Sequence, residues 1–311
     1  MSDSTSSSFY PIGIPGQPWA AAEIAAWRAR QRRQRSHADD VVAAIDGLAA
    51  RFDVETYGQL DHAGEHFPLL ALRSRGWDEA LPTLLVTGGV HGYETSGVHG
   101  ALQFLREHGQ ETAGRANLLV VPCVSPWAYE RVQRWNFDAQ DPNRNFNEGT
   151  PVPESAALLA LLAPLRGRVL MHIDLHETTD TDESEFRPAL AARDGKPFEP
   201  GTVPDGFYLV DDADHQQPGF QRAVVEAVAQ VTHIAPADAQ GLIIGSPLQQ
   251  PGVILFPVAK WSLCAAITGA RFATTTEVYP DSPRATPAQC NAAQAAAIRA
   301  AIGYALAQGL S

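Results

Sequence analysis

Strand-type and helix-type segments alternate through most of this chain. The apolar run at 83–89 (TLLVTGG) precedes a helical stretch at 95–108, and the run at 117–124 (NLLVVPCV) precedes one at 153–165. The run at 168–175 (RVLMHIDL) leads into a long loop, and the remaining helices and strands are expected at 217–233, 252–256, 271–278 and 287–308. Strands separated by helices pair in parallel through crossovers. The sequence therefore predicts an α/β fold with a doubly wound, mixed but mainly parallel sheet flanked by helices.

The first 50 residues differ from the rest. Residues 1–17 are rich in Ser, Pro and Gly without periodicity, and the Ala- and Arg-rich stretch at 18–35 favours a helix. β-type runs then begin at 52–57 and 66–73. We predict a tail and helical extension at 1–50, and a single α/β domain at 51–311.

Composition narrows the possible partners. The chain has 35 acidic and 23 basic residues and a formal charge of -12, without a basic stripe, so nucleic acid is not an expected partner. No apolar run approaches the roughly 20 residues of a membrane span, and the N-terminus does not read as a secretory signal. We therefore expect a cytoplasmic protein without a membrane partner. Cys123, Cys264 and Cys290 are far apart and are expected to be buried thiols.

Polar clusters follow two of the apolar runs, where ligands bind in open α/β sheets. His91 and Glu94 follow the first run in GGVHGYE. In MHIDLHETTD, the period of two places His172, Asp174 and His176 on one face of a strand, with His176 outermost. We predict that His176 joins His91 and Glu94 as a metal ligand, that Asp174 orients a ligand imidazole, and that His172 is a core residue.

Two histidines and one glutamate form the ligand set of a catalytic zinc, which keeps a fourth position for water. We predict one zinc ion per chain. The zinc-bound water needs a base to take its proton. Glu277 is the candidate, because it lies at the end of the β-branched run RFATTTEV, where a strand would bring it to the site. Asn143 and Arg144, in the polar run DPNRNFN, could hold a carboxylate. The alternative for Arg144 is a structural role in bracing its loop.

The order of these motifs resembles the order found in the zinc carboxypeptidase superfamily, including its succinylglutamate desuccinylase and aspartoacylase branch. GxHGxE, DxNRxF, a strand ending in DLHxT, and TEV occur in the family's order and span residues 83–280. The resemblance implies that His91, Glu94 and His176 bind zinc, that Asn143 and Arg144 hold the substrate's terminal carboxylate, and that Glu277 is the general base. It also implies that Arg134 polarises the scissile carbonyl, with Arg131 as an alternative.

Three features depart from the digestive carboxypeptidases of that family. Residues 242–276 contain no tyrosine to contact substrate, and Tyr208 could replace it only from a loop folded over the site. The motif DLHET is closer to the corresponding motif of the deacylases than to that of the digestive carboxypeptidases. The segment 177–206 is long and acidic, as active-site lids often are, although a solvated insertion has the same composition.

The function expected from these residues is a metallocarboxypeptidase that hydrolyses an amide bond next to a free carboxylate in small peptides. An N-acyl amino acid deacylase is the near alternative, and a non-catalytic zinc-fold protein that binds peptides is an alternative of another class. The substrate is thus a small peptide or an N-acyl amino acid. If the acidic segment covers the site, its Asp180, Asp182, Glu183 and Glu185 should favour cationic substrates.

Overall fold

The computed structural model describes residues 9–309 and is built around a large central sheet. Within these residues the sheet has ten strands in the order β1-β2-β4-β3-β5-β10-β6-β9-β8-β7. The strands are β1 (Phe52–His62), β2 (Glu65–Ser74), β3 (Thr83–Gly88), β4 (Asn117–Val121), β5 (Val169–Glu177), β6 (Tyr208–Asp212), β7 (Leu242–Ile243), β8 (Ser246–Gln250), β9 (Val253–Phe256) and β10 (Phe272–Val278).

The centre of the sheet is parallel and its margins are antiparallel. β4, β3, β5 and β10 run parallel to one another, as do β6 and β9. β1 and β2 form an antiparallel hairpin that joins β4, and β6 pairs antiparallel with β10. The predicted mixed, mainly parallel α/β fold is confirmed.

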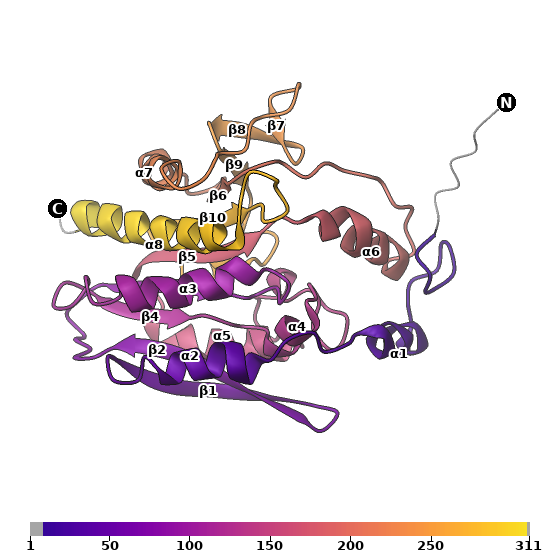
Figure 1. Cartoon of the computed structure of the whole chain (residues 1–311), viewed down its shortest axis with the longest axis horizontal. Helices are drawn as coiled ribbons and strands as arrows, with labels where there is room; N and C mark the ends of the chain where they lie inside the picture. Colours follow the sequence, from indigo (N-terminus) through magenta and orange to yellow (C-terminus); the bar gives the residue numbers. More distant parts are fainter. Residues whose placement is uncertain (1–8, 310–311) are drawn as a thin grey trace.

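Helices cover both faces of the sheet (Figure 1). They are α1 (Ala21–Arg30), α2 (Ala43–Asp46), α3 (Thr95–Glu107), α4 (Pro126–Arg131), α5 (Pro153–Leu162), α6 (Arg187–Arg193), α7 (Pro218–Val228) and α8 (Pro287–Gly309). α3, α7 and α8 pack on the face that contains Leu84 and Val86, whereas α5 packs on the face that contains Leu85. A strand buried on both faces needs a continuous apolar run, which β3 has.

The last helix begins as its sequence predicts. The Thr286 hydroxyl accepts a hydrogen bond from the Gln289 backbone N–H, and the Gln289 side chain accepts one from the Thr286 backbone N–H. This reciprocal pair is a capping box, and Pro287 occupies the first helical position.

The N-terminal region is less helical than its composition predicts. α1 ends at Arg30 instead of Arg35, and a short π-helical turn at Ala38–Val42 precedes α2. Arg35 leaves the helix because its guanidinium has better partners: it donates to the Gly92 and Tyr129 carbonyls and to the Thr95 hydroxyl. Residues 1–8 of the predicted tail lie outside the described residues.

The acidic segment 177–206 also differs from a plain loop. It contains a π-helical turn at Asp182–Phe186 that continues into α6. The short elements α4, β6, β7 and β8 are also present without having been predicted.

Candidate metal centre and active site

The candidate site lies at the carboxyl edge of the parallel strands. His91 follows β3, His176 is near the end of β5, and Glu277 is near the end of β10. β3 and β5 are neighbours, and His176 pairs directly with Glu277 across β5 and β10. Parallel pairing therefore brings three distant segments to one edge of the sheet.

The loop between β3 and α3 needs glycine at two points. Gly89 has φ +60°, a left-handed conformation that β-carbon-bearing residues rarely adopt. Gly92 lies so close to the backbone of Ala128 and Tyr129 in α4 that a β-carbon would clash. These two glycines explain the spacing of GGVHGYE, because they allow His91 and Glu94 to turn back toward the sheet.

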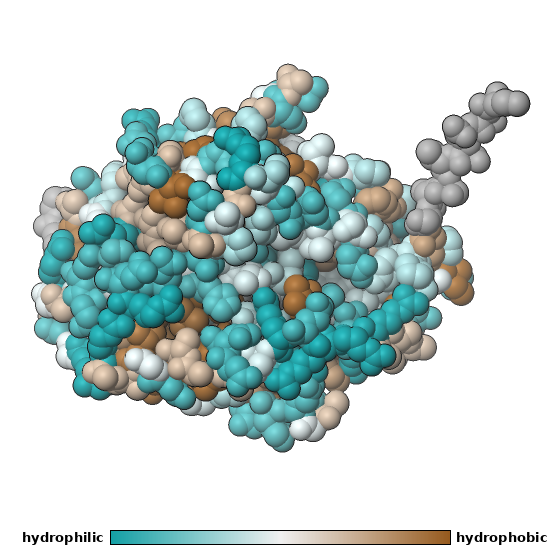
Figure 2. All heavy atoms as spheres, in the orientation of Figure 1, coloured by the Kyte–Doolittle hydropathy of each residue, from teal (hydrophilic) through white to brown (hydrophobic). Residues whose placement is uncertain are grey.

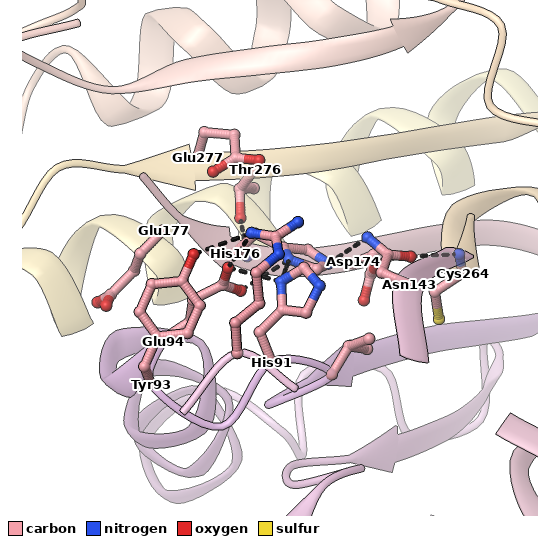
Figure 3. A network of polar contacts seen from close by, with 12 residues as sticks. His91, Tyr93, Glu94, Asn143, Asp174, His176, Glu177, Cys264, Thr276 and Glu277 are labelled. Atoms are coloured by element: carbon pink, nitrogen blue, oxygen red, sulfur yellow. Dashed lines mark hydrogen bonds and ion pairs between the residues drawn. The ribbon is translucent and has the colours of Figure 1, made fainter. Parts of the chain in front are cut away.

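The structure brings His91, Glu94 and His176 together, and each is only 1% exposed. Glu94 Oε1 lies 2.7 Å from His91 Nδ1, and Glu94 Oε2 lies 2.7 Å from His176 Nδ1. The two Nδ1 atoms are 3.2 Å apart. Figure 3 shows the three side chains pointing toward one another. Within residues 9–309 this is the one group of three or more His, Cys, Asp or Glu side chains close enough to hold a metal ion.

The outer nitrogen of each histidine faces an aspartate. His91 Nε2 is 2.9 Å from Asp141 Oδ1, and His176 Nε2 is 2.7 Å from Asp174 Oδ2. Ionised carboxylates only accept hydrogen bonds, so Asp141 and Asp174 fix a proton on the two Nε2 atoms, and each imidazole would offer Nδ1 to a metal ion after the loss of its second proton. In that state two nitrogen lone pairs and a carboxylate would face a common point, an arrangement that a bound cation stabilises. The residues fit a metal ion, and the aspartates orient the ligands as metal-bound histidines require.

The charges of the cluster are balanced internally. Although burial raises the pKa of Glu94, the adjacent His176 and His91 outweigh it and lower that pKa to about 2. For Asp141, burial is likewise outweighed by Arg134 and His91, which hold its pKa well below the usual range. Both carboxylates therefore remain ionised at neutral pH.

His172 is separate from this cluster, as predicted. Its Nε2 lies 3.0 Å from the Thr87 hydroxyl, and burial lowers its pKa to about 4. His172 is a neutral core histidine under the site.

Glu277 lies beside the cluster and is linked to two hydroxyl groups. The Thr178 hydroxyl donates to Glu277 Oε2 at 2.9 Å, and Thr178 Oγ1 lies 2.8 Å from the Tyr208 hydroxyl. Because the single Thr178 proton goes to Glu277, Tyr208 donates to Thr178. Burial raises the pKa of Glu277 to about 8. Tyr208 is in strand β6, so it supports Glu277 through Thr178 instead of reaching the site from a loop.

The structure distinguishes the two candidate arginines. Arg134 Nη1 lies 3.9 Å from Glu94 Oε1, and its Nε lies 3.1 Å from Asp141 Oδ2. Arg131 instead pairs with Glu65 and Glu130. Of the two, Arg134 is the one at the cluster.

Asn143 and Arg144 occupy different environments. Asn143 is buried: its Nδ2 is 3.4 Å from His176 Nε2, and its Oδ1 accepts a hydrogen bond from the Cys264 backbone N–H at 2.8 Å. Arg144 is exposed, and its Nη1 donates to the Asn143 carbonyl at 2.7 Å. Arg144 is therefore accessible to a substrate carboxylate, whereas part of Asn143 is already engaged by the protein.

The acidic segment folds over Arg134. The Phe186 ring lies 4.3 Å from the Arg134 guanidinium carbon, and Asp182 Oδ1 accepts a hydrogen bond from the Tyr93 hydroxyl at 2.9 Å. Arg134 Nη1 in turn donates to the Tyr93 hydroxyl at 2.9 Å. This segment thus covers one side of the site.

Sequence reasoning missed two residues here, Asp141 and Tyr93, and it named Asp182 only as one of the acidic residues of the segment 177–206. A carboxylate partner for His91 was to be expected from metal-site chemistry, and Asp141 stands two residues before Asn143 in the polar run. No comparable signal marked the hydrogen bond between Tyr93 and Asp182, because it joins side chains from two different loops.

None of the helices described within residues 9–309 is long and apolar enough to cross a membrane. On the face shown in Figure 2, hydrophobic residues appear in small separate patches among hydrophilic ones.

Comparison with known proteins gives a family match and a set of structural relatives. Residues 80–194 match the family model of the succinylglutamate desuccinylase/aspartoacylase catalytic domain. That segment includes His91, Glu94 and His176 but ends before Glu277. A search of the curated proteins found no match.

Solved structures of metallopeptidases share the fold. A candidate metallopeptidase from Shewanella denitrificans has a TM-score of 0.66 and 24% identity, over 86% of this chain and 89% of that one. A metallo-carboxypeptidase from Burkholderia cenocepacia has a TM-score of 0.58 and 14% identity, over 94% and 70%. A metallo-carboxypeptidase from Pseudomonas aeruginosa, in complex with (2-guanidinoethylmercapto)succinic acid, has a TM-score of 0.56 and 16% identity, over 86% and 69%.

The fold and the matched catalytic domain lead to one conclusion. The chain has the zinc carboxypeptidase-like fold and resembles the succinylglutamate desuccinylase/aspartoacylase branch, and these similarities support a hydrolase enzyme.

Proposed function

We propose that this chain is a zinc-dependent metallocarboxypeptidase that hydrolyses the amide bond next to a free carboxylate in small peptides. The observation that carries the proposal is the buried convergence of His91 Nδ1, His176 Nδ1 and Glu94, with both outer nitrogens bonded to aspartates. Three protein ligands leave a fourth position for water or substrate, as in catalytic zinc sites. We assign one zinc ion per chain to this site.

When bound, zinc would polarise the scissile carbonyl and make a water molecule more acidic. The chain's own residues would perform the remaining steps. Glu277 Oε2 is held by Thr178, so Oε1 is the oxygen that accepts the proton of the attacking water and passes it to the leaving amine. Arg134 would stabilise the developing oxyanion.

Arg144, and Asn143 behind it, would bind the terminal carboxylate. Arg144 is exposed and has no carboxylate partner among the described residues, so its guanidinium fork can pair with both oxygens of a substrate carboxylate. This contact would fix the scissile bond at a set distance from the chain end, which defines an exopeptidase.

The second candidate function is an N-acyl amino acid deacylase with the same machinery. It is favoured by the match of residues 80–194 to the succinylglutamate desuccinylase/aspartoacylase catalytic domain. The P. aeruginosa metallo-carboxypeptidase binds a ligand with a succinic acid group, which is consistent with carboxylate recognition in either function. A non-catalytic peptide binder has no use for Glu277 beside the cluster and is the weakest of the three.

We also propose a cytoplasmic location. It rests on the chain's three cysteines, Cys123, Cys264 and Cys290, which are buried and unpaired instead of forming disulfides.

The test is hydrolysis by purified, zinc-loaded protein of three substrate sets: dipeptides, longer peptides and N-acyl amino acids. Release of the C-terminal residue from dipeptides and longer peptides supports the carboxypeptidase. Turnover of N-acyl amino acids alone supports the deacylase. No turnover of any set, together with zinc-dependent peptide binding, contradicts both enzymatic functions.

A further inference from the structure

The N-terminal extension contacts the segment that carries two of the three candidate metal ligands. Arg35 belongs to this extension, and it lies before the first strand and outside the part of the chain that matches the family model. Its guanidinium nevertheless donates hydrogen bonds to the Gly92 carbonyl and, at 2.7 Å, to the Thr95 hydroxyl. Gly92 directly follows the ligand His91, and Thr95 directly follows the ligand Glu94. Arg35 therefore binds the chain next to each of these two ligands.

The ligand segment, residues 91–95, contains no helix or strand before Thr95, where α3 begins. Segments of this kind open more readily than helices and strands, so individual contacts must fix their position. The Tyr93 backbone N–H donates to the Gln133 carbonyl at 3.0 Å, and the Thr95 backbone N–H donates to Glu177 Oε2 at 3.0 Å. Both of these contacts use backbone N–H groups, whereas Arg35 binds oxygen atoms of the ligand segment.

The Thr95 hydroxyl connects Arg35 to the backbone around Glu94. It accepts a hydrogen bond from Arg35 and donates one to the Tyr93 carbonyl at 3.2 Å. An arginine side chain only donates, so the Thr95 proton is available for the Tyr93 carbonyl. The short stretch of backbone between these two points carries Glu94. The hydrogen bond from Arg35 thus restrains the backbone on both sides of this ligand.

Arg35 is itself anchored on α4. Its Nε donates to the Tyr129 carbonyl at 2.6 Å, and its guanidinium carbon lies 3.6 Å from the centre of the Tyr129 ring. The Gln34 backbone N–H donates to the Glu130 carbonyl at 2.8 Å, and the Gln34 side-chain amide donates to the Arg131 carbonyl at 2.9 Å. The last carbonyls of a helix have no partner within it, so the extension caps α4 at this end.

α4 also contacts the ligand segment directly. A β-carbon on Gly92 would lie 2.0 Å from the Ala128 carbonyl carbon, so no side chain separates the two backbones. The Arg35 guanidinium joins them, because it bonds to Tyr129 in α4 and to Gly92 in the ligand segment. A planar group with several N–H donors in fixed directions can make these contacts at the same time, which suits arginine better than lysine.

We propose that Arg35 is a positioning residue of the metal centre: it fixes the ligand segment against α4 and so places His91 and Glu94 before a metal ion binds. A preorganised site needs less rearrangement when the ion binds, and its affinity is correspondingly higher. The inference rests on the metal centre of the proposed function. It assigns part of that centre to the extension, which the predicted catalytic domain at 51–311 does not include.

The test compares the full-length variants Arg35→Met and Arg28→Met. Methionine retains an apolar side chain and removes the N–H donors. Arg28 is a matched control from the same extension: its guanidinium carbon lies 3.7 Å from the centre of the Phe137 ring, and its Nε donates to the Phe137 carbonyl at 2.7 Å. Neither Phe137 nor Asp138, which pairs with Arg28, belongs to the ligand segment.

We expect Arg35→Met to lower the zinc affinity of the folded protein by at least about tenfold, as the loss of residues that orient metal ligands does. Arg28→Met should leave the zinc affinity close to that of the wild type. Competition with a chromophoric chelator measures the affinity, and circular dichroism of the metal-free samples checks the fold. A merely structural role of Arg35 predicts a lower midpoint of thermal unfolding with unchanged zinc affinity, and that result would overturn the proposal.

Thr95→Val tests the same contact if Arg35→Met does not fold. Valine has the shape of threonine but can neither accept a hydrogen bond from Arg35 nor donate one to Tyr93. We expect this variant to bind zinc more weakly than both the wild type and Arg28→Met. A zinc affinity of Thr95→Val equal to that of the wild type contradicts the proposal.

Hydrogen exchange separates this proposal from the proposed function, because it needs neither a substrate nor a metal ion. In metal-free protein, the backbone amides of Tyr93 and Thr95 should exchange faster in Arg35→Met than in Arg28→Met and the wild type. Failure of the wild type to hydrolyse any substrate set counts against the proposed function and leaves this expectation unchanged. Equal exchange in the two variants contradicts the positioning role even when the wild type is an active enzyme.

Discussion

The hydroxyl of Thr178 donates a hydrogen bond to Glu277 Oε2 at 2.9 Å while it accepts one from Tyr208. Thr178 thus links β5, which carries His176, to the candidate base on β10. Thr178→Val keeps the shape of the side chain and removes this link. We expect about a tenfold fall in kcat with little change in KM and with zinc retained, because the carboxylate is less well oriented. A change in KM alone would assign Thr178 to substrate binding instead.

Metal content tests the ligand set. We expect about one zinc per chain in the wild type and a large loss of zinc in His176→Ala. The control, His172→Ala, changes a buried histidine that bonds to Thr87 outside the cluster. Zinc is measured by atomic absorption after dialysis, on samples whose circular dichroism shows native structure. Equal zinc retention in both variants would refute the choice of His176.

Glu277→Gln tests the base. The amide has the shape of the carboxylate but cannot accept the proton of water, so turnover should fall by at least about a hundredfold while zinc stays bound. Turnover equal to that of the wild type would remove Glu277 from the mechanism.

Arg144→Ala tests recognition of the substrate's terminal carboxylate. The variant should lower kcat/KM for free-carboxylate substrates, and the wild type should leave C-terminally amidated peptides intact. Cleavage of amidated and free peptides at the same rate would contradict both the carboxypeptidase and the deacylase.

The protonation of Glu154 should make the free energy of unfolding depend on pH. Glu154 is fully buried on α5, where its side chain accepts a hydrogen bond from Asn136, and burial raises its pKa to about 7. The folded protein then binds more protons than the unfolded chain between about pH 4.5 and 7, so its free energy of unfolding falls as pH rises through that range.

Glu154→Gln removes this titration. Urea unfolding should show the variant more stable than the wild type at pH 8, by up to about 3 kcal/mol, and no such advantage at pH 4. A constant difference between the two proteins at both pH values would show that Glu154 does not titrate in this range.

The sequence predicted the parts of the site that follow from strand ends. His91, His176 and Glu277 each stand just after or at the end of an apolar run, and parallel strands bring such positions to one edge. The closing helix was equally predictable, because Thr286 and Gln289 form a local capping box.

Contacts between loops had no such signal. Asp141 reaches His91 from the irregular segment after β4, where no periodicity defines the direction of a side chain. The Arg-rich stretch at 18–35 predicts a longer helix than α1, because local propensity does not include the buried partners that Arg35 finds near Gly92 and Tyr129.

The convergence of β3 and β5 has a consequence for how the protein acquires its metal. His91 and His176 are 85 residues apart, so the unfolded chain does not hold all three ligands together, and the full binding energy is gained only when the central strands are in place. Zinc should therefore raise the midpoint of thermal unfolding in proportion to the logarithm of its free concentration, and a chelator should lower it. Metal supply would then set how long the folded chain persists, as well as whether it is active.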